Sequence, residues 1–129
     1  MKIHNNFSLI NHNSFGIEAN AEKFVSISTV QELEKIIASN HNEEKVFIGG
    51  GSNILITRNI KGLVINLNMK GISSKKIDDN HSEVKINSGE NWNDCVKWCL
   101  KNNLGGIENL SLIPGNTGAA PIQNIGAYG

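Results

Sequence analysis

The spacing of apolar positions predicts that the chain opens with a strand, a helix and a second strand. Residues 24–27 are a short run rich in aromatic and β-branched side chains, which favours a strand. Apolar residues then recur at helical spacing over residues 30–39, preceded by Thr29 and Glu32 at the spacing of a capping box. Residues 45–48 form a second apolar run. This order predicts parallel strands joined by a right-handed crossover.

Beyond this unit the pattern predicts short strands and one further helix. We expect β-like segments at 54–57, 63–67 and 83–87, and residues 72–77 should pair with the last of these across a turn at 78–80. The second helix has an N-cap at Ser88 or Asn91, an αL end at Gly105-Gly106, and an apolar face made of Trp92, Cys95, Val96, Cys99 and Leu100. After Gly105 the periodicity is lost among glycines and prolines.

The composition excludes several classes of function. The 129 residues carry 12 Lys and Arg against 12 Asp and Glu, so the chain lacks the basic surface of a nucleic-acid clamp or a polybasic membrane anchor. Met1 to Asn13 contain no secretory signal, and no apolar run approaches the roughly 18 residues of a membrane span. The length favours one domain. We expect no nucleic-acid or membrane partner and a cytoplasmic location.

The single arginine, Arg58, limits how an anion could be bound. An arginine-lined polyphosphate or carboxylate site cannot be built from these residues. Any phosphate must therefore be held mainly by backbone N–H groups, and the 13 glycines make this possible.

The cysteines and histidines predict no metal site. Cys95 and Cys99 lie one helical turn apart without a further Cys or His at zinc-like spacing, so we interpret them as small apolar residues of a helix face. The four histidines are scattered among polar residues, and no Ser-His-Asp arrangement can be read from them.

Two glycine-rich segments are the candidates for ligand binding. Gly49 to Asn53 directly follow an apolar strand, where convergent amides could bind an anion, although a glycine-rich hairpin turn would have the same sequence. The segment matches neither the dinucleotide-binding fingerprint nor a P-loop, because no helix follows and the Lys-Ser/Thr ending is missing. Pro114 to Pro121 are mostly small. If this second segment is buried its amides need partners, which a ligand would supply; the alternative is an ordered surface loop.

Five segments together resemble the UDP-N-acetylenolpyruvoylglucosamine reductase family over nearly the whole chain. The most specific is the ending P-G-x-x-G-x-x-P-I-Q-N-I-G-A-Y-G. The segments are Asn13 to Ile17, Ile48 to Leu55, Ser88 to Trp92, Gly106 to Leu110 and Ile113 to Gly129. The resemblance implies an α+β chain with an α/β-like start and a truncated FAD-binding fold of the vanillyl-alcohol-oxidase/p-cresol-methylhydroxylase type. It implies FAD as cofactor, NADPH as co-substrate, and reduction of UDP-N-acetylglucosamine enolpyruvate to UDP-N-acetylmuramate by a monomeric enzyme of peptidoglycan synthesis.

The resemblance also assigns roles to residues. The first loop would wrap the FAD pyrophosphate, the second would line the rest of the cofactor, and Tyr128 would lie by the substrate entrance. The implied cofactor-binding residues are Gly49, Gly50, Gly51, Ser52, Asn53, Pro114, Gly115, Thr117, Gly118, Ala119, Ala120, Ile122, Gly126 and Ala127. Some relatives carry serines where this chain has Ala119 and Ala120, so a hydroxyl contact there is absent while the amides remain.

The family's catalytic serine, glutamate and arginine lie downstream of Gly129, so we expect no catalytic residue within these 129 residues. The resemblance divides the chain into a small β-α-β FAD-binding subdomain at 1–56 and an incomplete second FAD-binding subdomain with one helix at 57–129; the substrate-binding domain is missing. This predicts an N-terminal fragment, inactive alone. The alternatives are a stand-alone FAD- or nucleotide-binding module and another oxidoreductase of the same FAD fold.

Overall fold

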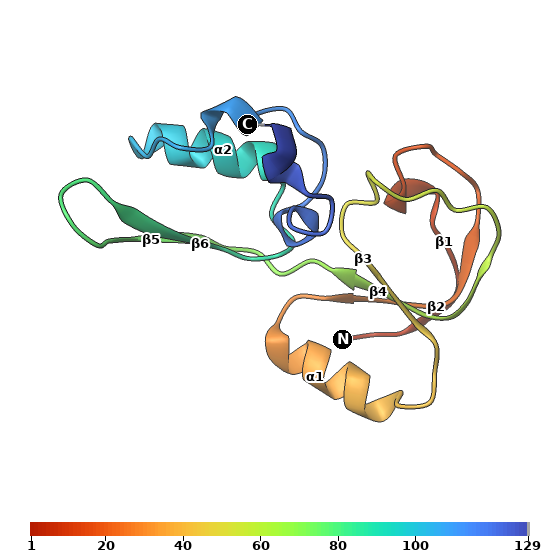
Figure 1. The fold of residues 1–129 in the computed structure, drawn as a ribbon. Helices are drawn as coiled ribbons and strands as arrows, with labels where there is room; N and C mark the ends of the chain where they lie inside the picture. Colours follow the sequence, from red (N-terminus) through yellow and green to blue (C-terminus); the bar gives the residue numbers. More distant parts are fainter. Residues whose placement is uncertain (129) are drawn as a thin grey trace. The chain divides into compact units, whose positions relative to one another are not determined.

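The first apolar runs of the chain build a four-stranded sheet. The computed structural model describes residues 1–128, except for the side chains of Ala127 and Tyr128, and the chain forms two compact units, Met1–Met69 and Lys70–Gly129. In the first unit β1 (His4–Ser8), β2 (Asn20–Ile27), β4 (Ile60–Leu67) and β3 (Lys45–Ile48) lie side by side in that order (Figure 1). β2 and β3 both run parallel to β4, and β1 runs antiparallel to β2. The predicted strands at 24–27 and 45–48 are therefore parallel, with β4 inserted between them.

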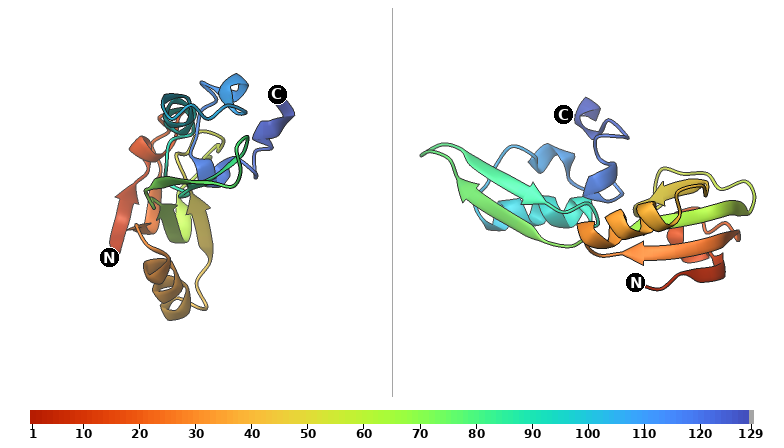
Figure 2. Two further views of the ribbon diagram at one scale, coloured as in Figure 1. Left: turned by 90° about the vertical axis from the view of Figure 1, so that its left-hand side faces the viewer. Right: turned by 90° about the horizontal axis from the view of Figure 1, so that it is seen from below.

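The sheet has an apolar cluster on each face. On one face α1 (Val30–Ser39) packs Ile36 and Leu33 against residues of β2 and β4 (Figures 1 and 2). The other face is covered by segments without strand structure: Leu9, Ala19 and Ile56 join Phe24 and Val64 in the second cluster. The alternation of side chains along β4 explains the division, since Leu63 and Ile65 belong to the first cluster and Val64 to the second.

Two features of this unit differ from the sequence prediction. Residues 54–57 form no strand: Ile54 and Ile56 pack on the core as a covering segment, and their backbone has no partner strand among the described residues. β1 was not predicted, because its five residues are polar apart from Phe7 and mostly exposed, which leaves no alternating signal.

The predicted start of α1 is confirmed, with a small change in the cap. The Thr29 hydroxyl accepts a hydrogen bond from the Glu32 amide at 3.1 Å, as in a capping box. The Glu32 carboxylate, however, accepts from the amide of Ser28 at 2.7 Å, one residue earlier than the cap residue. That bond lowers the pKa of Glu32 below its usual value.

The second unit combines a hairpin, a helix and short 3₁₀ turns. β5 (Ile72–Lys76) and β6 (Ser82–Ile86) form the predicted antiparallel hairpin, which runs alongside α2 (Trp92–Lys101) (Figures 1 and 2). Asn91 is the N-cap, and its side chain accepts from the Asp94 amide at 3.2 Å. The single-turn 3₁₀ helices of the chain are η1 (Ile10–His12), η2 (Glu108–Leu110), η3 (Thr117–Ala119) and η4 (Ile125–Tyr128).

The predicted end of α2 at Gly105-Gly106 is wrong. The helix ends at Lys101, Asn102 is its C-cap, and Asn103 takes the left-handed conformation with φ 55°. The amide of Leu104 then donates to the carbonyl of Cys99 at 2.9 Å. Asparagine tolerates this conformation better than most residues, so a glycine is not required to end the helix.

Candidate functional site

The first glycine loop leaves β3 at the carboxyl end of the three parallel strands, where ligands often bind in open α/β sheets. Gly50 and Asn53 are exposed, Gly49 and Ser52 are half-buried, and Gly51 is buried. Within residues 1–128, none of the five amides from Gly49 to Asn53 donates a hydrogen bond to protein. The loop therefore has a run of consecutive N–H groups that an anion could accept from.

Gly51 fixes the course of this loop. Its φ is 67°, and its carbonyl accepts a hydrogen bond from the amide of Ser14 at 3.0 Å. A Cβ placed on Gly51 would lie 1.9 Å from the carbonyl oxygen of His12 and 2.9 Å from the Cα of Asn13. Both the backbone conformation and the close approach therefore require glycine here.

Asn66 holds the start of the loop. Ser26 on β2, Asn66 on β4 and Ile48 on β3 stand in one row across the sheet. The Asn66 amide nitrogen donates to the carbonyls of Ile48 at 3.4 Å and Gly49 at 3.1 Å, while its oxygen accepts from the Ser26 hydroxyl at 3.1 Å. The point at which the chain leaves the sheet is thus hydrogen-bonded to the central strand.

Asn13 organises the segment that packs against the loop from the other side. Its side chain is buried and donates to the carbonyls of Leu9 at 2.8 Å and Ile17 at 3.0 Å, and it accepts from the Ile17 amide at 2.9 Å. These bonds close the segment from 9 to 17, which carries the His12 carbonyl and the Ser14 amide. The first two segments of the family resemblance, 13–17 and 48–55, are therefore in direct contact.

The second glycine-rich loop has a different arrangement, because the amides of Thr117 to Ala120 donate hydrogen bonds within the protein. Thr117 and Gly118 donate to the carbonyls of Glu90 and Ser88 at 2.9 and 3.0 Å, and Trp92 donates to Gly115 at 2.9 Å. Ala119 and Ala120 donate to Asn116 and Thr117 within the η3 turn, at 3.0 and 3.1 Å. The expectation that a ligand supplies partners to these amides is wrong for Thr117 to Ala120, since residues 88–90 and the turn itself supply them.

Side-chain contacts also join the second loop to residues 87 and 88. The Thr117 hydroxyl donates to the Asn87 carbonyl at 2.7 Å. A Cβ on Gly118 would lie 2.6 Å from the Cβ of Ser88, so the two chain segments touch at that point. The Ser88 hydroxyl is buried and has no hydrogen-bond partner among the described residues. The segment 88–92 of the resemblance is therefore the support on which the second loop rests.

The remaining predicted site residues are less constrained. Pro114 and Gly126 are exposed, and Ile122 is 87% exposed. The side chains of Ala127 and Tyr128, and all of Gly129, lie outside the described part of the chain. The two loops belong to different units.

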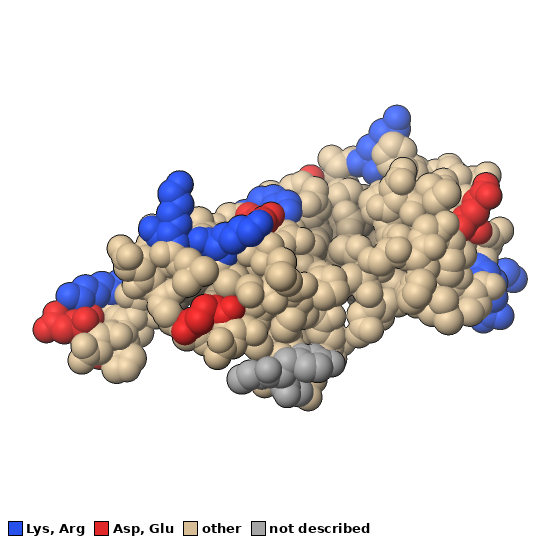
Figure 3. Space-filling model, turned by 90° about the horizontal axis from the view of Figure 1, so that it is seen from above, with Lys and Arg blue, Asp and Glu red and all other residues tan. Residues whose placement is uncertain are grey.

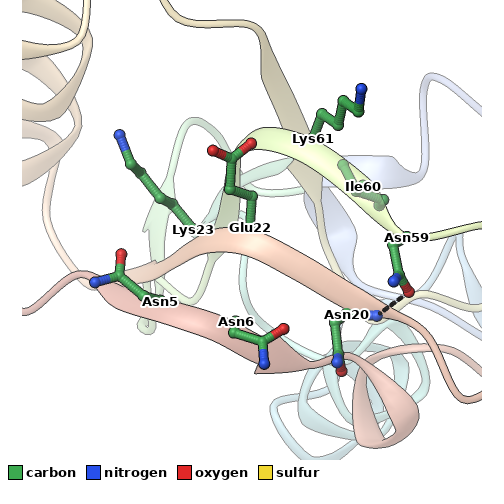
Figure 4. Close-up of a pocket in the computed structure, with 8 residues that line it drawn as sticks. All are labelled: Asn5, Asn6, Asn20, Glu22, Lys23, Asn59, Ile60 and Lys61. Atoms are coloured by element: carbon green, nitrogen blue, oxygen red, sulfur yellow. Dashed lines mark hydrogen bonds between the residues drawn. The ribbon is translucent and has the colours of Figure 1, made fainter.

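Two of the hollows in the first unit differ in their relation to the first loop. One, of about 510 Å³, lies over β1, β2 and β4 and contains no predicted site residue; Figure 4 shows its asparagines and the diverging side chains of Lys23 and Lys61. The Asn20 amide donates to the Asn59 side chain there at 2.9 Å. The other, of about 250 Å³, adjoins the first loop, because Ile48 and Ile54 on either side of the loop line it together with Phe47, Leu55 and Arg58. The first loop thus borders an apolar hollow with one cation.

Among the described residues, the ionisable side chains form no metal-binding group, and both cysteines are buried. Cys95 and Cys99 are free and buried, as the helix pattern predicts, and burial raises the pKa of the Cys95 thiol to about 11. No group of three or more His, Cys, Asp or Glu side chains within residues 1–128 could hold a metal ion. On the face that Figure 3 shows, charged side chains stand in small groups of both signs. No helix in the described part is long and apolar enough to cross a membrane.

Comparison with known proteins gives a consistent result. Residues 21–129 match the family model of the FAD binding domain. The chain is 52% identical over 129 residues to UDP-N-acetylenolpyruvoylglucosamine reductase of Flavobacterium johnsoniae and 44% identical over 131 residues to the enzyme of Amoebophilus asiaticus, covering 100% of this chain in both cases. It covers 38% and 39% of those relatives' lengths.

A solved structure shares the fold. The crystal structure of UDP-N-acetylenolpyruvylglucosamine reductase (MurB) from Thermus caldophilus matches 93% of this chain and 41% of its own chain, with a TM-score of 0.67 and 20% sequence identity. The predicted α+β FAD-binding fold is thereby confirmed. The resemblance read from the five sequence segments is confirmed as well, for the N-terminal part of these reductases.

Sequence reasoning missed the asparagines that support the first loop. Asn66 interrupts the apolar run Leu63 to Leu67, and a polar residue inside a buried strand is a signal that could have identified it. In the sequence Asn13 is only the first residue of a motif, because its three backbone hydrogen bonds exist only in the folded segment.

Proposed function

This chain belongs to the FAD-binding domain family, and we propose that it forms the FAD-binding part of an NADPH-dependent reductase. The reaction is the conversion of UDP-N-acetylglucosamine enolpyruvate to UDP-N-acetylmuramate. The observation that carries the proposal is the 52% identity, over all 129 residues, to a reductase named for this chemistry. Since the chain spans 38% of that relative, the activity, the substrates and a monomeric state are proposed for the protein that carries this chain.

The first glycine loop fits the pyrophosphate of FAD. A pyrophosphate presents several anionic oxygens, and Gly49 to Asn53 offer consecutive amides without protein partners in the described residues. The buried Gly51 has no room for a side chain, so the backbone of the loop forms the surface that would contact the pyrophosphate. Arg58 is the one arginine of the chain and lines the adjoining hollow. These residues would therefore meet the pyrophosphate charge with backbone amides and not with several arginines.

The second loop serves a different purpose in this proposal. The amides of Thr117 to Ala120 are already satisfied, so these residues would provide a shaped wall of small side chains rather than N–H donors. Pro114, Gly115, Ile122, Gly126 and Ala127 are proposed to extend that wall, with Tyr128 beside the substrate. FAD, when bound, supplies the hydride transfer between nicotinamide and the enolpyruvyl group. We place the protein in the cytoplasm, which the two free cysteines support.

The test separates cofactor binding from catalysis. We expect the 129-residue chain to bind FAD more tightly than riboflavin in calorimetric titrations, because riboflavin lacks the pyrophosphate. A Gly51→Val variant should lose this preference, whereas Gly105→Ala should keep it, since the nearest neighbour of a Cβ on Gly105 is a flexible glutamate side chain at 3.9 Å.

The gene product that carries the chain should oxidise NADPH over many turnovers only when the enolpyruvyl nucleotide is present. Without that nucleotide and without oxygen, oxidation should stop at one equivalent of NADPH per bound FAD. A product that binds FAD but does not turn over this substrate would identify a stand-alone binding module instead. A gene product without bound FAD would overturn the proposal altogether.

A further inference from the structure

We propose that Asn13 and Asn66 are positioning residues that hold the first glycine loop in the conformation that binds the FAD pyrophosphate. They are the polar residues of the described part that are buried as a whole, at 7% and 9% exposure. Asn66 bonds to the loop directly, whereas Asn13 bonds within the segment that packs against it. The inference rests on the proposed function for the identity of the ligand. The claim that these two side chains fix the loop rests on hydrogen bonds and on the close packing at Gly51.

Asn66 supports the loop from the sheet. It lies on the central strand β4, and its amide nitrogen reaches the carbonyls of Ile48 and Gly49 on the neighbouring edge strand. With these carbonyls turned toward Asn66, the peptide groups at the start of the loop have a fixed orientation. The Ser26 hydroxyl donates to the Asn66 oxygen, which settles which end of the amide faces β3.

Asn13 supports the loop from the covering segment. All three of its hydrogen bonds are made to backbone groups of residues 9 and 17, so it acts as a bridge that closes the segment between them. That segment presents the Ser14 amide to the Gly51 carbonyl and packs the His12 carbonyl where a Cβ of Gly51 would stand. If the segment opened, Gly51 would lose both its bond and its packing.

A loop held in this manner can keep its own amides free and still be rigid. Burying an amide side chain costs free energy unless its hydrogen bonds are made, and both asparagines make them to backbone near the loop. An anion that binds preformed donors avoids the entropy cost of ordering the loop. The two asparagines therefore contribute to affinity without contacting the ligand.

The experiment compares Asn13→Ala and Asn66→Ala with Asn40→Ala in the 129-residue chain. Asn40 is the matched control, because its side chain donates to the Ile36 carbonyl at 3.0 Å at the end of α1, away from the loop. Ser26→Ala is a milder variant that leaves Asn66 in place but removes the bond that orients it. The readouts are ¹⁵N order parameters of residues 49–53 and dissociation constants for FAD and riboflavin.

We expect Asn13→Ala and Asn66→Ala to lower the order parameters of residues 49–53 and to weaken FAD binding about tenfold, with riboflavin binding nearly unchanged. Ser26→Ala should give a smaller change in the same direction, and Asn40→Ala none. Unchanged order parameters in both variants would overturn the inference. So would an equal loss of FAD and riboflavin affinity that follows the loss of thermal stability. A wild-type chain without FAD affinity would instead contradict the claim that these residues alone bind the pyrophosphate, and the order parameters would still decide the role of the asparagines.

Discussion

The two glycine-rich loops resemble each other in sequence but differ in which backbone amides remain free to bind a ligand. The loop from Gly49 to Asn53 is held through its carbonyls and by close packing at Gly51, and its amides have no protein partners within residues 1–128. The loop from Pro114 to Ala120 is held mainly in its second half, where the amides of Thr117 to Ala120 donate to residues 88–90 and within the η3 turn. Glycine content thus predicts a shaped backbone, whereas the neighbouring segments decide whether that backbone can still bind an anion.

The largest effect should come from Gly51→Ala. The substitution combines a φ of 67° with a Cβ that would lie 1.9 Å from the His12 carbonyl, so the covering segment must move. We expect the free energy of unfolding of the first unit to fall by roughly 3–4 kcal/mol. Gly16→Ala is the control, because Gly16 has φ 62° with nothing within 4 Å, and should cost about 1 kcal/mol.

Urea unfolding followed by the amide NMR signals of β2 and β4 measures both variants. The two tryptophans, Trp92 and Trp98, lie in the second unit, so their fluorescence is the internal check that the effect stays in the first. Equal losses for the two substitutions would mean that packing against His12 does not hold the loop.

A smaller effect is expected from Gly118→Ala in the second loop. A Cβ here would meet the Cβ of Ser88 at 2.6 Å, and its φ is not in the left-handed region, so only the packing term applies. We expect a loss of about 2 kcal/mol, measured by tryptophan fluorescence during urea unfolding. Ser88→Gly in the same chain should restore part of that loss, because it removes the group that the new methyl meets. Additive effects of the two substitutions would contradict the contact between residues 88 and 118.

The smallest effect is a pH dependence confined to the first unit. The half-buried His12 ring lies 5.5 Å from Phe7 and 4.8 Å from Phe24 between ring centroids, and burial lowers the pKa of its imidazole. The unfolded chain, with a pKa of about 6.5, therefore binds the proton more readily than the folded unit. The contribution of His12 to stability is present in full above about pH 6.5 and is lost as the pH falls through the lower, folded pKa.

Urea midpoints of the first unit at pH 7.5 and pH 5 should therefore differ, and His12→Gln should reduce the difference. His41→Gln is the control, since His41 is exposed in the turn after α1. If His12→Gln leaves the difference between the two urea midpoints unchanged, groups other than His12 cause the pH dependence.

Local sequence patterns predicted the elements whose stability is decided locally. Both helices and the β5–β6 hairpin have their own periodicity and caps, and Thr29 and Asn91 cap the helices as the spacing indicates. The predictions of secondary structure were wrong where contacts between residues far apart in the sequence determine the structure. The apolar residues at 54–57 cover a core cluster instead of pairing as a strand, and polar β1 is a strand because β2 offers an edge.

The same distinction applies to the candidate site. The sequence located both loops, and the family resemblance supplied FAD, which belongs to the family model that this chain matches. The sequence could not show which amides already donate a hydrogen bond within the protein. The acceptors for Thr117 and Gly118 lie at residues 88–90, and only the fold brings them together. Nor could the sequence show that Asn13 and Asn66 act on one loop, since they stand far apart in the chain and meet only in the folded first unit.

The most direct test of this account is a titration of the ¹⁵N-labelled chain with ADP, the half of FAD that carries adenosine and pyrophosphate. The account predicts that the largest amide shift changes occur at Gly49 to Asn53, with those of Thr117 to Ala120 clearly smaller because these groups already donate hydrogen bonds. Adenosine should leave residues 49–53 nearly unaffected. Shift changes concentrated at Thr117 to Ala120, or equal changes with adenosine and ADP at the first loop, would contradict it.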